Sequence, residues 1–126
     1  MARLVGEDDS YLLAAETWIA RAGASDEQQS NVVGIAGYRY VLRNRDRREL
    51  LSYHWHQSGP SPIITPHLHV GCRAGNADLS KVHLPTGHVA LVDVVRCAIT
   101  EFRVEPLRAD WRAVLDRAAR TLSNRV

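Results

Sequence analysis

Apolar side chains recur with two different periods along the chain, and the period changes near residue 90. Before that point, short runs rich in β-branched and aromatic residues are separated by turn-forming clusters, which is typical of β-strands. After it, apolar positions recur every three or four residues, which indicates amphipathic helices. The predicted strands cover 31–42, 49–56, 63–71 and 78–84, and the predicted helices run from 90 to before Pro106 and over 108–122.

The segment 11–22 carries opposing signals. Its alanines favour helix. Thr17, Trp18 and Ile19, which stand just ahead of the turn-like residues 23–26, favour strand. We interpret this segment as a strand.

Residues 31–56 predict a β-hairpin whose tip is the charged run 43–48. The Gly- and Pro-rich residues 59–62 end the second strand of that hairpin. Strands followed by helices imply an α+β fold. We therefore expect one domain over 1–126, in which an antiparallel sheet of about four strands is covered on one face by the two C-terminal helices.

The composition is that of an ordinary globular protein, with 45% hydrophobic and 24% charged residues. No apolar run approaches the length of a membrane span, and the first ten residues are acidic rather than signal-like. Cys72 and Cys97 show no paired spacing, so we expect reduced thiols rather than a disulfide. These features predict a soluble cytoplasmic protein without a membrane partner.

Charge is distributed unevenly about the net value of +2. Residues 1–38 hold two arginines and six acidic residues, a net charge of −4, and the rest of the chain is +6. The positive part also holds every histidine. This distribution permits binding to phosphate or to an acidic partner.

All six histidines fall between positions 54 and 88, and four of them form two His-x-His pairs. Alternate side chains of a strand share a face, so each pair presents two imidazoles on one side of its strand. The residues between and beside them, such as Trp55 and Leu68, are apolar enough to face the core. If the two strands are neighbours in register, the four imidazoles of His54, His56, His67 and His69 meet at one place.

Three uses of these histidines remain open. Neutral imidazole is a good zinc ligand, so His54, His56, His67 and His69, joined by Cys72, would form a metal site for a zinc-type binding protein or metal-dependent hydrolase. Alternatively, the histidines are a surface row without chemistry on a protein that binds a partner chain. His83 and His88 are interpreted as structural residues.

The third use is metal-independent acid–base cleavage of RNA, which is our preferred interpretation. The 2′-hydroxyl of RNA is an internal nucleophile, so the protein needs one imidazole as base, one as acid and a cation for the phosphate. His54, His56, His67 and His69 are the candidate catalytic residues. Candidate phosphate- or substrate-binding residues are Arg43 at the hairpin tip, Arg73, Lys81, Arg96 and Tyr53.

A family resemblance adds to this interpretation. Tyr38-Arg39-Tyr40, Tyr53-His54-Trp55-His56 and Pro66-His67-Leu68-His69-Val70 resemble the TumE-type toxin components of bacterial toxin–antitoxin systems, over about residues 38–71. The resemblance implies a toxin that acts on RNA and is neutralised by a helix-turn-helix antitoxin. It also implies functional roles for His67 and His69, and by extension for His54 and His56. The oligomeric state stays open, a homodimer included.

Overall fold

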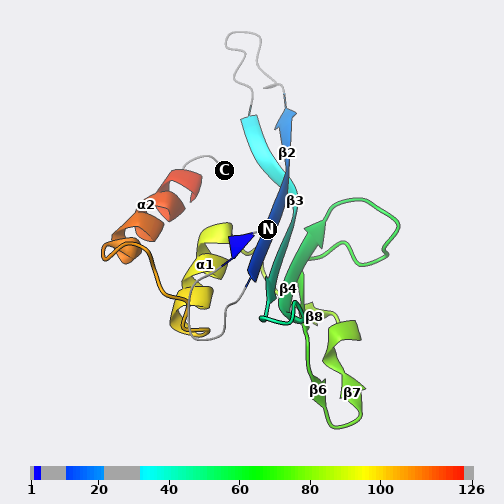
Figure 1. The fold of residues 1–126 in the computed structure, drawn as a ribbon. Helices are drawn as coiled ribbons and strands as arrows, with labels where there is room; N and C mark the ends of the chain where they lie inside the picture. Colours follow the sequence, from blue (N-terminus) through cyan, green and yellow to red (C-terminus); the bar gives the residue numbers. More distant parts are fainter. Residues whose placement is uncertain (1, 4–10, 22–31, 124–126) are drawn as a thin grey trace.

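The computed structural model of the chain describes residues 2–3, 11–21 and 32–123 (Figure 1). Its strands precede its two helices, so the predicted α+β class is confirmed. In chain order the elements are β1 (Ala2–Arg3), β2 (Tyr11–Arg21), β3 (Val32–Arg43), β4 (Glu49–His56), β5 (His67–Val70), β6 (Arg73–Ala74), β7 (Ala77–Asp78), the 3₁₀ helix η1 (Leu79–Lys81), β8 (Leu84–Pro85), α1 (Leu91–Thr100) and α2 (Trp111–Ser123).

Six of the described strands form one antiparallel sheet, in the order β1-β2-β3-β4-β5-β8, and β6 pairs with β7 apart from it. The sheet order follows the chain order, as it does when each strand folds back onto the previous one. The hairpin predicted over 31–56 is β3 and β4, and the strand predicted over 11–22 is β2. Pairing of β2 along β3 outweighs the helical propensity of the β2 alanines.

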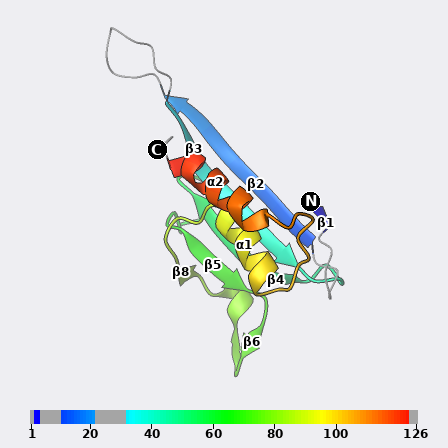
Figure 2. The same ribbon diagram turned by 90° about the vertical axis from the view of Figure 1, so that its left-hand side faces the viewer.

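The alternation of side chains along β3 and β4 divides the molecule into two sides. Tyr38 and Tyr40 of β3, with Tyr53 and Trp55 of β4, belong to one face, where they pack with Leu12 and Val94. Helices α1 and α2 cover this face, as Figures 1 and 2 show. A second buried cluster joins Leu42 to Ala98 and Val104. The histidines of β4 and β5 therefore belong to the opposite face, away from the helices.

Tyr40 connects the hydrophobic core to strand β2. Its side chain is fully buried, and its hydroxyl donates a 2.5 Å hydrogen bond to the Glu16 carboxylate of β2. Burial, followed by that carboxylate, raises the pKa of Tyr40 well above its ordinary value. The hydroxyl is therefore a fixed donor at neutral pH.

Two predicted strands differ from the structure. The prediction of one strand over 78–84 is wrong, because Asp78 caps η1 by accepting from the Ser80 backbone N–H at 3.1 Å, and only Leu84–Pro85 pairs with β5. The strand predicted over 63–71 is shorter, and begins at His67 directly after Pro66. Proline has no N–H to give to a ladder, which accounts for a strand that starts beyond it.

Candidate functional site

Three imidazoles converge where β4 pairs with β5. The register places His54 directly opposite His67, and His69 lies two residues further along β5, opposite Ser52. The ring centroids of the three histidines are 5.6, 5.1 and 5.1 Å apart. One nitrogen atom from each ring lies within 4.8 Å of the other two. We call His54, His67 and His69 the histidine cluster.

A fourth ring, that of His83, lies against the cluster. The chain after β5 forms β6, β7 and η1, and η1 packs back against β5. His83 follows η1, and its ring centroid is 4.9 Å from that of His67 and 4.6 Å from that of His69. Its side chain is exposed. The gathering of six histidines into 35 positions was the sequence signal for this contact, but the return of the chain was not visible in the sequence.

The hydrogen bond of His67 fixes its tautomer. His67 is buried, with 4% of its surface exposed, and its Nδ1 lies 2.8 Å from the Thr65 carbonyl oxygen. A carbonyl only accepts, so Nδ1 carries the proton and donates it. The lone pair is then on Nε2. Metal-bound histidines are commonly held in this way, with the second ring nitrogen donating to a backbone carbonyl.

The other two rings also have a nitrogen free to accept. His54 Nε2 shares a 2.5 Å hydrogen bond with the hydroxyl of the fully buried Ser52. When Nε2 carries the proton and donates to Ser52, the lone pair is on Nδ1. His69 Nδ1 is buried and has no hydrogen-bond partner among the described residues. Because buried polar atoms are nearly always paired, this nitrogen is available to an ion, a ligand or a water molecule.

Burial lowers the pKa of two of the three cluster imidazoles, those of His54 and His69. Desolvation lowers the pKa of His54 to about 4, with further lowering by the charge of Arg39 and by the neighbouring imidazoles. Desolvation, then His83, also lowers the pKa of His69, while hydrogen bonding to the Ser80 backbone opposes this. The neutral ring is the form that binds a metal.

This pKa shift predicts how the metal-free protein responds to acid. Both folded and unfolded states have neutral His54 above pH 6.5; below it the unfolded state gains a proton that the folded state accepts only near pH 4. Stability is therefore lost between these values, by about 1–2 kcal/mol from His54 after allowance for solvent screening. Urea unfolding would give the free energy of unfolding at pH 7 and at pH 4. The drop between the two should be smaller for His54→Gln than for wild type. An equal difference in both proteins would contradict this assignment.

His56 and Cys72 lie outside the cluster. His56 shares the face of His54, but β5 begins at His67, so no β5 residue pairs with His56. Cys72 is an exposed free thiol just beyond the end of β5. His88 stacks edge-on against Trp55, with centroids 4.3 Å apart, and so belongs to the other side of the sheet.

The predicted phosphate-binding residues are scattered. Tyr53 packs against the core on the helix-covered face, and Arg96 of α1 forms a 2.7 Å ion pair with Asp116 of α2. Neither side chain faces the cluster. Arg73 and Lys81 are exposed on the segment that follows β5, and Arg43 is half-buried at the end of β3.

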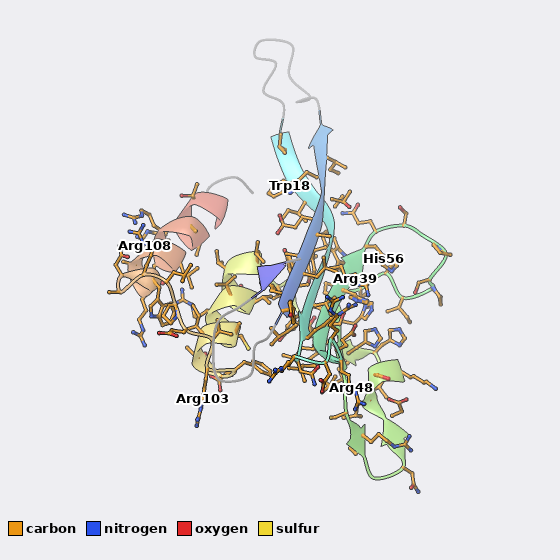
Figure 3. All side chains as sticks on the ribbon, in the orientation of Figure 1. Trp18, Arg39, Arg48, His56, Arg103 and Arg108 are labelled. Atoms are coloured by element: carbon orange, nitrogen blue, oxygen red, sulfur yellow. The ribbon has the colours of Figure 1, made fainter. Side chains whose placement is uncertain are left out.

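Arg39 is a further cation near the cluster, and it was not among the residues predicted to bind phosphate. The register of β3 and β4 places it opposite His54. Figure 3 shows Arg39 and His56 on the side of the sheet away from the helices, whereas Arg103 and Arg108 lie with the helices. Strand alternation was the available signal, because Arg39 stands between two core tyrosines and must point the other way.

A cavity of about 610 Å³ opens beside the cluster, which we call the Arg39 cavity. Arg39, His54 and His56 line it, together with residues of β2 and the start of the loop after β4. His56 Nδ1 is buried with no hydrogen-bond partner in the described part of the chain. The cluster thus has a chamber next to it that is large enough for a small substrate.

No protein-family model, curated protein or solved structure matches this chain. The resemblance to TumE-type toxins stays a prediction. No helix within the described residues has the length and apolar character that crossing a membrane requires. The function must therefore be argued from the site.

The donor set fits a metal ion of the zinc type. Three neutral imidazoles and an open fourth position are the ligand set of one class of catalytic zinc site. Tetrahedral nitrogens about 2.0–2.1 Å from the ion stand about 3.4 Å apart. The widest separation of the cluster nitrogens, 4.8 Å, must therefore close by about 1.4 Å when the ion binds.

Proposed function

We propose that this protein is a metal-dependent hydrolase whose ion is bound by His54, His67 and His69. The observation that carries the proposal is the convergence of three imidazole nitrogens within 4.8 Å of one another. The fixed tautomer of His67 and the partnerless Nδ1 of His69 support it. Among the open uses of the histidines, metal binding is favoured because the pKa values of His54 and His69 are lowered, which makes these two rings poor proton donors for acid–base cleavage.

The ion would supply Lewis acidity and a bound water whose pKa is lowered towards about 7. The residues of the chain have separate tasks. Ser52 and the Thr65 carbonyl orient the rings of His54 and His67. His56 lines the Arg39 cavity next to His54, so its imidazole is placed to give a proton to a leaving group.

The proposal predicts metal-dependent hydrolysis. Untagged protein would be stripped with a chelator, reloaded with one equivalent of Zn²⁺ or Co²⁺, and tested on chromogenic carboxylic esters, phosphate monoesters and phosphate diesters. At least one class should be hydrolysed only by the reloaded protein. His56→Ala should bind metal with unchanged stoichiometry but react about 10²-fold more slowly, as expected for loss of a proton donor.

His88→Ala is the matched control, because His88 contacts Trp55 on the other side of the sheet. It should behave like wild type. Cleavage of RNA that continues undiminished in excess chelator, and that is lost in His67→Ala, would replace this proposal with metal-independent acid–base cleavage. Absence of hydrolysis of every class by metal-loaded protein would also contradict it.

A further inference from the structure

The charged groups that line the described part of the Arg39 cavity are basic. Among the described residues, its lining contains the guanidinium of Arg39 and the imidazoles of His54 and His56, and no aspartate or glutamate. Arg39 is exposed and has no ion-pair partner among the residues that the structure describes. Arg96 and Arg108, by contrast, are paired with Asp116 and Asp110. The cavity therefore offers an uncompensated positive charge to an anion.

That charge lies beside the histidine cluster. Arg39 and His54 are direct cross-strand partners, and the side chains of such partners begin about 5 Å apart. An anion held by the guanidinium thus lies next to the ion that His54 would bind.

The geometry favours a phosphoryl group over a carboxylate. A guanidinium binds two oxygens of an oxyanion through parallel N–H donors. A carboxylate has only two oxygens, so a carboxylate paired with Arg39 could reach the ion only by sharing one oxygen between the guanidinium and the metal. A phosphoryl group has a further oxygen for the metal, and clamps of arginine and metal ions on a transferring phosphoryl group are a recurrent arrangement.

The cavity is larger than a phosphate ion requires. At about 610 Å³ it falls in the range of small-molecule sites. Ala15 and Ile19 of β2, with Ala36 of β3, give it an apolar wall, and Thr17, Gln57 and Ser58 add hydrogen-bonding groups. This wall is suited to the organic part of an ester.

We propose that the Arg39 cavity binds a small phosphate ester, with the phosphoryl group between Arg39 and the metal ion and the organic group along β2. This inference rests on the proposed hydrolase function, which it deepens by naming the substrate class. In the reaction, the oxygen of water forms a bond to phosphorus and the ester P–O bond breaks. The alcohol leaves with one proton of the water, so the products are an alcohol and phosphate.

The test follows the visible spectrum of Co²⁺-loaded, untagged protein during titration with inorganic phosphate, phenyl phosphate and benzoate. For wild type, both phosphates should shift the spectrum, phenyl phosphate at lower concentration, and benzoate should bind at least about tenfold more weakly than phenyl phosphate. Arg39→Ala should weaken phosphate binding about 10- to 100-fold, the usual cost of a charge-assisted contact. Arg39→Lys should recover part of this loss, because lysine keeps the charge but not the paired donors.

Arg108→Ala removes the same charge on the helix side and should match wild type. Equal phosphate affinity in Arg39→Ala and wild type would overturn the inference, as would benzoate binding as tightly as phenyl phosphate. In either case the cobalt spectrum without added anion still reports an intact metal site. Failure of wild type to bind cobalt would overturn the proposed function and this inference together.

Discussion

Replacing His67 by alanine is expected to weaken zinc binding by at least about 100-fold, because loss of a residue that only supports a ligand already costs about 10- to 100-fold. His67 is the most buried ring of the histidine cluster, and its Nδ1–H bond to Thr65 sets the direction of its lone pair. Competition with a chromophoric chelator gives the dissociation constants of untagged wild type and variant.

A second variant distinguishes loss of a zinc ligand from a folding defect in His67→Ala. His54 is less buried than His67, so His54→Ala should remain folded and still lose zinc affinity by a similar factor. Zinc at 1,000 times the wild-type dissociation constant should stabilise wild type by about 4 kcal/mol, and a variant with 100-fold weaker binding by only about 1.4 kcal/mol. His88→Ala should keep both properties. Zinc affinity that is unchanged in His54→Ala and His67→Ala would contradict the assignment of the ligands.

The second large effect is expected for Gly71→Ala, which should lower the free energy of unfolding by about 2–4 kcal/mol, as a backbone clash does. A Cβ at Gly71 would stand 1.6 Å from the Glu49 carbonyl oxygen, so backbone must move. The Gly71 N–H also donates to the Leu50 carbonyl at 2.9 Å, which ends the pairing of β4 with β5. Displacement of β5 would carry His69 away from His54 and weaken zinc binding as well.

Urea unfolding measures the first effect, and the zinc titration measures the second. Gly87→Ala is the matched control, because a Cβ there meets no atom within 4 Å. The free energy of unfolding of Gly87→Ala should stay within about 0.5 kcal/mol of that of wild type. A Gly71→Ala protein as stable as Gly87→Ala would contradict the close approach of the two strands.

The main strands and the face of each His-x-His pair could be predicted from the sequence. The β-formers of β3 and β4 flank a charged tip, so the hairpin and its alternation follow from local patterns. Convergence of the two His-x-His pairs was predicted for four rings, and the structure brings together three. His56 is left out because β5 begins only after Pro66, and strand length depends on pairing that the pattern does not encode.

The packing of the segment after β5 against the histidine cluster could not be predicted. Strands of two residues, such as β6, β7 and β8, are too short to show a period. The Asp78 cap turns 79–81 into a 3₁₀ helix where a strand was expected, and this turn brings His83 onto the cluster. Arg39 was overlooked for another reason, since its importance depends on the register with His54 rather than on its own neighbours.

The most direct test of the central claim is calorimetric titration of metal-stripped, untagged protein with Zn²⁺ at pH 7. The account predicts one tightly bound ion per chain in wild type and in His88→Ala, and none in a His54→Ala/His67→Ala double variant that circular dichroism shows to be folded. A wild-type protein that takes up no zinc, or a folded double variant that binds it as tightly as wild type, would contradict the account.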